Sequence, residues 1–324
     1  PTGQGKSLTF QIPALLLYQK FKFLTLVISP LVSLMDDQVK GLPKMLPACR
    51  INSSMNEKQK SKTLEDLANN KYAILYISPE ALNSWCSNPD SSFLKSVPAI
   101  GLAVIDEIHC LSQWSHSFRP SYLRVCSILK RLYVPVIMGL TATATDDTCK
   151  EVISHLDTNT HYDNEQFKQS SEKKCFLLRK VNIPKNIIVS CCQIENSDRN
   201  TKDDHLVEVL KSFRFKDLNS IIIYCTRREE CERLKTTLEI EDLEGRTIEV
   251  YHAGLTPSKR KKVQKDFMSE KINIMIATVA FGMGIDKQDV RSVIHYNLPK
   301  NFESYVQEIG RSGRDGKLSY CHLR

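Results

Sequence analysis

The sequence predicts an α/β protein with two open sheets of parallel strands, one in each half of the chain. Short apolar runs without polar alternation recur, and such runs are typical of parallel strands buried on both faces. Segments of helical length separate them, and this alternation of strand and helix predicts parallel sheets. The predicted strands are residues 24–29, 73–77, 102–105 and 136–140 in the first half, and 220–225, 273–277 and 292–296 in the second.

The length of the chain and one polar segment predict two domains. A chain of 324 residues can form two domains of ordinary size, each with its own core. Residues 157–174 are polar and lack clear periodicity, which indicates a linker or a surface insertion. We therefore expect a first lobe over residues 1–180 and a second lobe over residues 181–324.

The composition is that of a globular protein with a basic surface. Hydrophobic residues make up 41% and charged residues 25% of the chain, which argues against global disorder. The net charge of +8 fits a polyanionic partner such as nucleic acid, although many basic proteins bind none. The 11 cysteines form no C-x-x-C pair, which favours a reducing, intracellular compartment and no zinc site. No apolar run reaches membrane-spanning length.

The first seven residues, PTGQGKS, are the last part of the phosphate-binding pattern G/A-x-x-x-x-G-K-S. Glycines in such a loop let backbone N–H groups face phosphate oxygens, and the helix that follows presents its positive end. Lys6 would reach the β- and γ-phosphates, and the Ser7 hydroxyl would bind Mg²⁺. A chance Gly-Lys-Ser in a glycine turn is the alternative. The residues expected to bind the nucleotide here are Thr2, Gly3, Gln4, Gly5, Lys6 and Ser7. We also expect a strand before Pro1, flanked by the strands at 102–105 and 136–140.

Two carboxylates follow the predicted strand at 102–105. Asp106 and Glu107 would lie at the carboxyl edge of the sheet, where α/β proteins bind ligands. Asp106 would hold Mg²⁺ and Glu107 would polarise the attacking water, with the two side chains on opposite faces of an extended segment. A solvated strand end is the alternative. His109 is a further catalytic candidate, although a lone histidine is more often structural.

A late arginine motif, residues 307–314, contains Gln307, Arg311 and Arg314. A phosphate loop, an acidic pair and a late arginine pair, in this order, are the three parts that an ATP-driven motor needs.

These motifs make the chain resemble the RecQ family of superfamily 2 DNA helicases over essentially its whole length. The matching stretches are residues 1–7, 27–39, 78–80, 106–109, 140–144, 251–254, 277–286 and 307–314. Residues 112–126 are most similar to the type four branch, which is associated with Rothmund–Thomson syndrome. The chain departs from the family at Ile108, where Ala is usual, and at Gln4, where many members have Gly.

The resemblance implies two RecA-like lobes with ATP bound between them. It implies that Gln307, Arg311 and Arg314 face the nucleotide, where an arginine neutralises the charge that grows during phosphoryl transfer. Phosphate contact with nucleic acid is the alternative for these arginines. Gly284 and Asp286 would lie beside the nucleotide, with Asp286 bonded to the ribose and linking ATP to DNA movement.

Residues 114–122 resemble the aromatic-rich loop of the family. Trp114 and Phe118 offer ring faces for base stacking, and His116 and Arg119 offer contacts to phosphates. The loop follows the acidic pair directly, so we expect it to couple DNA binding to hydrolysis. A buried aromatic cluster is the alternative.

Further candidate contacts to DNA phosphates are Ser29 in the first lobe and Arg227 and Thr278 in the second. A basic run, residues 259–262, lies in a predicted helix at 258–268 whose apolar face would hold Val263 and Phe267. We interpret this run first as a solvated helix face, then as a DNA contact, and last as a nuclear localisation signal.

Together these features predict an ATP-dependent DNA helicase that uses ATP and Mg²⁺ and acts on single-stranded and forked DNA. The resemblance supplies the 3′→5′ direction, the choice of DNA over RNA, a nuclear location, and a role in repair, recombination or replication. The alternatives are an RNA helicase, a duplex translocase, and a nucleic-acid-binding scaffold without activity. Intact Lys6, Asp106, Glu107 and Arg314 argue against the scaffold.

Overall fold

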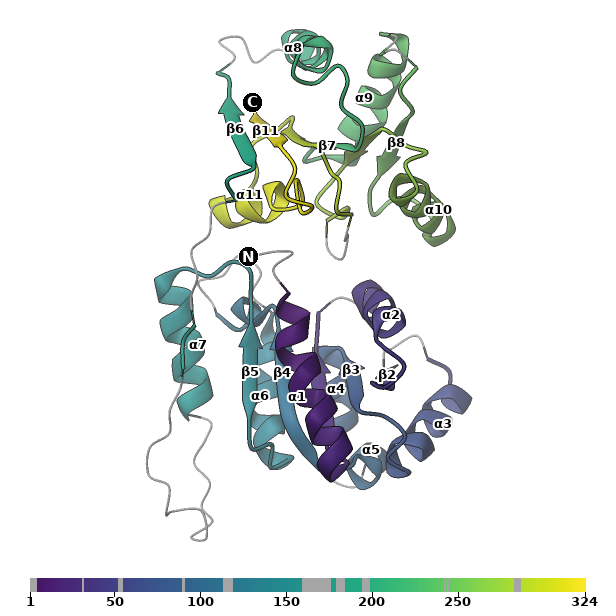
Figure 1. The fold of residues 1–324 in the computed structure, drawn as a ribbon, viewed down its shortest axis with the longest axis vertical. Helices are drawn as coiled ribbons and strands as arrows, with labels where there is room; N and C mark the ends of the chain where they lie inside the picture. The colour runs from purple at the N-terminus through teal and green to yellow at the C-terminus, as the bar shows by residue number, and fades with distance from the viewer. Residues whose placement is uncertain are drawn as a thin grey trace. The chain divides into compact units, whose positions relative to one another are not determined.

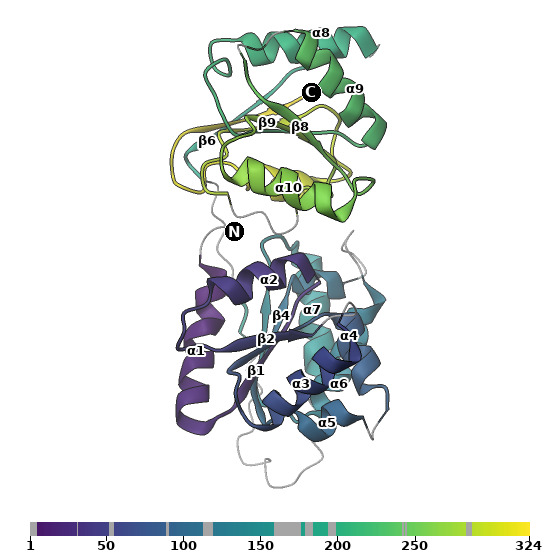
Figure 2. The ribbon, with the colours of Figure 1, turned by 90° about the vertical axis from the view of Figure 1, so that its right-hand side faces the viewer.

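The fold, known from a computed structural model, consists of two compact units that divide between residues 180 and 181. Figures 1 and 2 show both units. The structure describes residues 5–30, 32–51, 55–88, 91–112, 119–158, 176–178, 184–193, 199–241, 243, 245–282 and 287–324.

The first lobe is built on a five-stranded parallel sheet in the order β2-β3-β1-β4-β5. Its strands are β1 (Leu24–Ile28), β2 (Ala48–Ile51), β3 (Ile74–Ile77), β4 (Ile100–Asp106) and β5 (Ile137–Leu140). Its helices are α1 (Lys6–Phe21), α2 (Val32–Gly41), α3 (Glu57–Ala68), α4 (Pro79–Cys86), α5 (Ser92–Ser96), the 3₁₀-helix η1 (Ile108–Leu111), α6 (Pro120–Arg131) and α7 (Asp146–Thr158).

Both faces of this sheet are covered, which explains its apolar strands. Alternate residues of a strand point to opposite faces, so Leu26 packs beneath α3, α4 and α6 while Val27 packs beneath α1 and α2. On the second face, Phe10 and Ala14 bring α1 into contact with the sheet. The strands are therefore mainly apolar along their length, and the candidate site residues Ser29 and Asp106 lie where strands end.

The position predicted for a strand before Pro1 is wrong. β4 pairs directly with β5, with Val104 opposite Met138, so the strands near 102 and 136 do not flank a third one. β5 stands at the edge of the sheet and is only partly buried.

The second lobe contains a six-stranded parallel sheet in the order β6-β11-β10-β7-β9-β8. Its strands are β6 (Ile187–Cys191), β7 (Ile221–Tyr224), β8 (Ile248–Tyr251), β9 (Ile274–Ala277), β10 (Ser292–His295) and β11 (Ser319–Leu323). Its helices are α8 (Arg199–Lys211), α9 (Arg228–Ile240), α10 (Pro257–Met268) and α11 (Phe302–Ile309). α8 and α9 cover one face, and α10 covers the other.

The predicted fold class of two parallel α/β lobes is confirmed, and all seven predicted strands are present. The helix predicted at 258–268 is α10, and it buries Val263 and Phe267 as expected. The predicted linker at 157–174 lies outside the described residues, except for its first two, which end α7.

One buried histidine gives the second lobe a pH-dependent stability. His322 on β11 lies 2.9 Å from the Ser190 hydroxyl of β6 and stacks near His205. Burial lowers the pKa of His322 to about 4, and the nearby His205 and Arg324 add to this effect. Between its ordinary pKa of 6.5 and this value, the unfolded chain binds a proton that the folded chain does not.

We therefore expect the melting temperature of the second lobe to fall as the pH drops from about 6.5 toward 4. His322→Gln should flatten this dependence in thermal melts recorded across that range. An unchanged profile in His322→Gln would contradict the assignment.

Candidate functional site

The N-terminus of α1 is open to an anion. Gly5 caps the helix with φ 75°, a left-handed conformation that favours glycine, and within the described residues no N-cap side chain bonds to the N–H groups of the first turn. Lys6 and Ser7 begin the helix, and its first turn holds no acidic residue. This geometry fits the phosphate-binding role predicted for Gly5, Lys6 and Ser7. Thr2, Gly3 and Gln4 lie outside the described residues.

Asp106 ends β4 beside the end of β1. Its Oδ2 lies 3.2 Å from the hydroxyl of Ser29, which is fully buried, and its Oδ1 accepts a hydrogen bond of 3.0 Å from the Glu107 N–H. Burial raises the pKa of Asp106 to about 6, and the Glu107 carboxylate adds to this, while Lys6 and Ser29 lower it. The desolvated carboxylate, with Lys6 within electrostatic range, fits a site that takes up a cation.

Glu107 is not extended, contrary to the expectation that it continues the strand. Its φ of 49° is left-handed, which is uncommon for a residue with a side chain and often marks a functional site. This turn begins η1 and places the Glu107 carboxylate 3.3 Å from Nδ1 of His109. The carboxylate therefore has a defined neighbour.

His109 links Glu107 to the segment after β5. The ring is buried, and its Nδ1 lies 2.7 Å from the Thr141 hydroxyl. That hydroxyl donates to the Thr143 carbonyl at 2.7 Å, so it accepts from His109, and Nδ1 carries the proton. His109 thus contacts both Glu107 and Thr141 through the same ring nitrogen, which is compatible with a structural or a catalytic role.

The bulk of Ile108 is accommodated by a glycine. Ile108 is buried, and its Cδ1 occupies the space where a Cβ on Gly139 of β5 would stand. The departure from the family at position 108 is therefore matched by the absence of a side chain opposite it.

The aromatic-rich loop is described only at its two ends, because Trp114, His116 and Phe118 lie outside the described residues. Before it, Ser112 is fully buried and donates to Glu151 of α7. After it, Arg119 donates from its backbone N–H to the Cys110 carbonyl at 3.0 Å. Both ends of the loop are thus held by the first lobe.

The helix after this loop is bonded to the acidic pair. Tyr122 of α6 is fully buried, and its hydroxyl donates to the Asp106 carbonyl at 3.0 Å. The guanidinium of Arg119 is 3.4 Å from the Pro30 carbonyl, next to Ser29. Residues on either side of the loop therefore contact the ends of β1 and β4.

The candidate phosphate contacts of the second lobe follow strand ends. Thr278 comes directly after β9 and is half-buried, and Arg227 is exposed and precedes α9. The Arg227 N–H and the Thr226 hydroxyl both lie 3.2 Å from Glu230, which shapes this turn. Gly284 and Asp286 lie outside the described residues.

The residues of the arginine motif have different environments. Gln307 on α11 and Arg314 after it are half-buried, whereas Arg311 is 6% exposed. Arg311 donates to the Gly282 carbonyl, and within the described residues it has no carboxylate partner. A buried guanidinium without a counter-charge is costly unless an anion approaches it.

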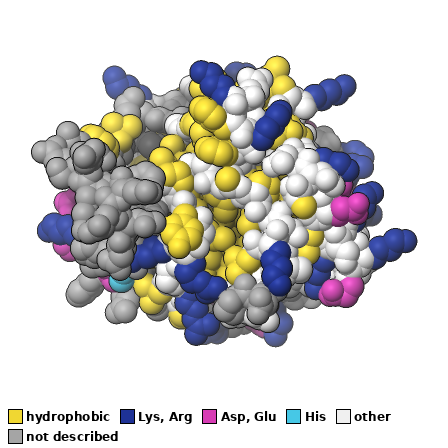
Figure 3. Space-filling model, turned by 90° about the horizontal axis from the view of Figure 1, so that it is seen from below, with side chains coloured by type: hydrophobic (Ala, Val, Ile, Leu, Met, Phe, Trp, Pro, Cys, Tyr) yellow, Lys and Arg dark blue, Asp and Glu magenta, His cyan; other side chains and the backbone are white. Residues whose placement is uncertain are grey.

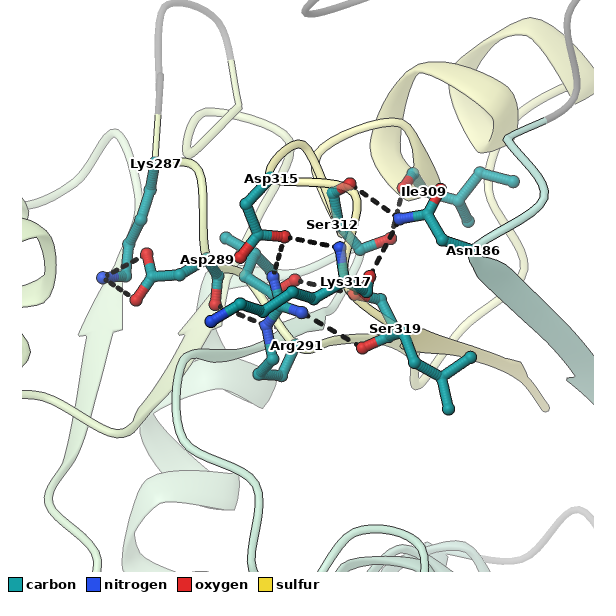
Figure 4. A network of polar contacts seen from close by, with 12 residues as sticks. Asn186, Lys287, Asp289, Arg291, Ile309, Ser312, Asp315, Lys317 and Ser319 are labelled. Atoms are coloured by element: carbon teal, nitrogen blue, oxygen red, sulfur yellow. Dashed lines mark hydrogen bonds and ion pairs between the residues drawn. The ribbon is translucent and has the colours of Figure 1, made fainter.

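A polar network fixes the turn that follows Arg314 (Figure 4). Arg291 pairs with Asp315 at 2.6 Å and donates to the Leu318 carbonyl at 3.1 Å. The Asn186 amide donates to the carbonyls of Gly313 and Lys317 at 2.7 and 2.8 Å. The end of the arginine motif is therefore rigidly attached to β10 and to the start of β6.

The sequence interpretation did not include three buried polar residues of the second lobe. Tyr224, His295 and Glu308 lie in the core, and His295 is 2.7 Å from Glu308. The only sequence signals were an aromatic and a histidine closing two apolar strands, and a glutamate inside the arginine motif.

The surface agrees with the basic composition. In the face shown in Figure 3, Lys and Arg side chains outnumber acidic ones and surround hydrophobic side chains. Within the described ranges, no helix has the length and apolar character that a membrane crossing requires. The same residues contain no group of three or more His, Cys, Asp or Glu that could hold a metal ion.

Comparison with known proteins identifies two helicase domains in this chain. Residues 1–152 match the DEAD/DEAH box helicase family, and residues 201–316 match the helicase conserved C-terminal domain. Among solved structures, the helicase MrfA bound to DNA and AMPPNP covers the whole chain with a TM-score of 0.74 and 20% identity, over 45% of its own length. Yeast Dbp5 bound to RNA covers 99% of the chain with a TM-score of 0.66 and 18% identity, over 76% of its own length. These likenesses confirm the fold.

Curated relatives match every part of the chain. ATP-dependent DNA helicase Q4 of Homo sapiens is 45% identical over 100% of this chain and 26% of its own length. Helicase Q-like 5 of Arabidopsis thaliana is 39% identical over 33% of its length, and RecQ of Bacillus subtilis is 38% identical over 49%. The chain thus spans a quarter to a half of these relatives. Its similarity to helicase Q4 agrees with the predicted type four branch, and the chain belongs to the RecQ family of helicases.

Proposed function

We propose that this chain is the motor of an ATP-dependent DNA helicase that moves 3′→5′ along single-stranded DNA and unwinds duplexes. The arrangement of Asp106, Glu107 and His109 at and after the end of β4, with Lys6 at the start of α1 within electrostatic range of Asp106, carries the proposal. Support for DNA comes from the curated relatives, which are 37–45% identical and named as DNA helicases. The RNA-bound neighbour is only 18% identical.

The proposed chemistry assigns one task to each side chain of the first lobe. Lys6 would neutralise the terminal phosphates of ATP, and Ser7 and Asp106 would hold Mg²⁺. Bound Mg²⁺ would withdraw charge from the phosphate oxygens. At such sites Mg²⁺ is typically held by one or two protein oxygens together with substrate phosphates and water.

Glu107 accepts the proton of the attacking water, and His109 orients its carboxylate at a distance of 3.3 Å. Ser29 is fully buried and bonded to Asp106, so we assign it to positioning Asp106 and not to a DNA phosphate. Trp114, His116 and Phe118 keep the proposed coupling role, which is supported by the bonds from Ser112 and Tyr122 on either side of the loop.

In the second lobe, Gln307, Arg311 and Arg314 are proposed to contact the nucleotide, and Gly284 and Asp286 to lie beside it. Arg227 and Thr278 are proposed contacts to DNA phosphates, because both follow strand ends. We propose residues 1–180 as the ATP-binding lobe and 181–324 as the helicase C-terminal lobe, in line with the two compact units and the two family matches. A DNA substrate in a eukaryotic cell would place the protein in the nucleus, which imaging of the tagged full-length protein would test.

The complete protein should hydrolyse ATP in a DNA-stimulated manner and displace a strand from a forked DNA. Glu107→Gln should retain ATP binding but lower hydrolysis about 10²–10⁴-fold, as expected when a general base is lost. Lys6→Ala should instead weaken nucleotide binding. Turnover assays with single-stranded DNA and binding of a fluorescent ATP analogue would measure both.

Strand displacement on matched DNA and RNA duplexes separates the remaining possibilities. Unwinding of RNA alone would identify an RNA helicase, and ATPase activity without displacement would identify a translocase. Normal DNA-stimulated turnover in Glu107→Gln would refute the assignment of the general base.

The two arginines should differ in their effect on stability. Arg314→Ala should lower turnover about 10³–10⁵-fold, as for a lost arginine finger, with little change in melting temperature. Arg311→Ala should lower turnover and also destabilise the second lobe by about 1–3 kcal/mol, because it leaves the buried Gly282 carbonyl unsatisfied. Equal melting temperatures for the two variants would contradict the burial argument.

A further inference from the structure

Tyr224 lies at the centre of a buried polar cluster in the second lobe. It ends β7, is 3% exposed, and stands opposite His295 in the register of β7 and β10. The two rings stack with centroids 5.7 Å apart and an angle of 27° between their planes. The position of the Tyr224 side chain is thus fixed by the central strands of the sheet.

The hydroxyl of Tyr224 reaches the loop after β9. It donates to the Phe281 carbonyl at 2.8 Å, three residues beyond Thr278. Burial raises the pKa of Tyr224 to about 12, although the nearby Arg311 opposes this effect, so the hydroxyl keeps its proton and remains a donor.

Arg311 binds the same loop at the next residue. Its guanidinium donates to the Gly282 carbonyl, and a Cβ on Gly282 would lie only 2.8 Å from the Arg311 Nη2. The Nε of Arg311 is also buried and makes no hydrogen bond within the described residues. A side chain at position 282 would therefore force the guanidinium to move, and among the residues that the structure describes the Arg311 Nε remains free to donate a hydrogen bond.

Glu308 attaches α11, which ends two residues before Arg311, to the same cluster. Its Oε2 lies 2.7 Å from Nε2 of His295, with both side chains buried. One face of Tyr224 thus contacts a histidine bonded to α11, while its hydroxyl holds the loop that Arg311 also binds. Strand β7, the loop and α11 are connected through this one side chain.

We propose that Tyr224 is a positioning residue that couples the arginine motif to the loop from Thr278 to Gly282. The inference rests on the proposed function, in which Arg311 meets the nucleotide and Thr278 meets a DNA phosphate. An anion that binds the Arg311 guanidinium changes its hydrogen bond to the Gly282 carbonyl. Tyr224 transmits this change because its hydroxyl is bonded to the adjacent Phe281 carbonyl. Such coupling is a free energy shared between two sites, so it acts in both directions.

Tyr224→Phe in the full-length protein tests this, because it removes one buried hydroxyl and keeps the ring. The hydrolysis rate without DNA should stay within about twofold of wild type. Stimulation by oligo-dT should fall about fivefold, the factor that one ordinary hydrogen bond is worth. The ratio of oligo-dT affinities measured with and without AMPPNP should shrink by a similar factor.

Tyr305→Phe is a matched control in the same cluster. Tyr305 of α11 packs against His295 with centroids 5.1 Å apart, and its buried hydroxyl makes no hydrogen bond within the described residues. This variant should keep wild-type stimulation and a wild-type affinity ratio. Glu308→Gln, which weakens the bond to His295 at nearly constant volume, should lose stimulation as Tyr224→Phe does.

Three results would overturn the inference. In the first, Tyr224→Phe keeps wild-type stimulation by oligo-dT and a wild-type ratio of oligo-dT affinities with and without AMPPNP. In the second, the Tyr305→Phe control loses stimulation and affinity ratio to the same extent as Tyr224→Phe. In the third, the basal and the stimulated hydrolysis rates of Tyr224→Phe fall in parallel with its melting temperature. The last result would make the hydroxyl merely structural. If wild-type protein showed no DNA-stimulated hydrolysis, the proposed function itself would fail, and the two failures are therefore distinguishable.

Discussion

Both lobes depend on the burial of parallel strands on their two faces. Such strands can bury a polar group along their length only at a desolvation cost or with a partner, as His322 and Ser190 show, so most polar residues of the candidate site lie at strand ends. Ser29 and Asp106 follow this rule in the first lobe, as do Tyr224, Thr278 and His295 in the second. The carboxyl ends of neighbouring parallel strands meet at one edge of the sheet, which brings residues distant in the sequence into contact.

The buried charges at these edges are balanced by specific bonds. Asp106 accepts bonds from Ser29 and from a backbone N–H, while Glu308 is paired with His295. Arg311 is the exception, since its described partners include a carbonyl and no carboxylate. Removing one member of such a set leaves the others desolvated, which costs more than the bond itself contributes. The same buried side chains therefore contribute both to the stability of their lobe and to the proposed chemistry.

The central strands and the motif residues could be predicted from the sequence because their signals are local. Apolar runs identified β1, β3, β4, β5, β7, β9 and β10, whereas polar residues interrupt the apolar pattern of β2, β6, β8 and β11, so these strands were missed. The left-handed turn at Glu107 and the partner of His109 depend on contacts across the fold, which periodicity does not encode. The burial of Arg311 and the role of Tyr224 likewise arise from a loop that approaches from another strand.

Because Ile108 occupies the space beside Gly139, the side chains at positions 108 and 139 compete for the same volume. A side chain can be added at 139 only where residue 108 is small, and Ile at 108 requires glycine opposite it. Replacing Ile108 with the alanine usual in the family would open a cavity and cost about 2–5 kcal/mol. We therefore expect substitutions at one of these positions to be tolerated only when the other changes with it, so that position 108, beside the proposed catalytic carboxylates, evolves jointly with position 139 on the edge strand β5.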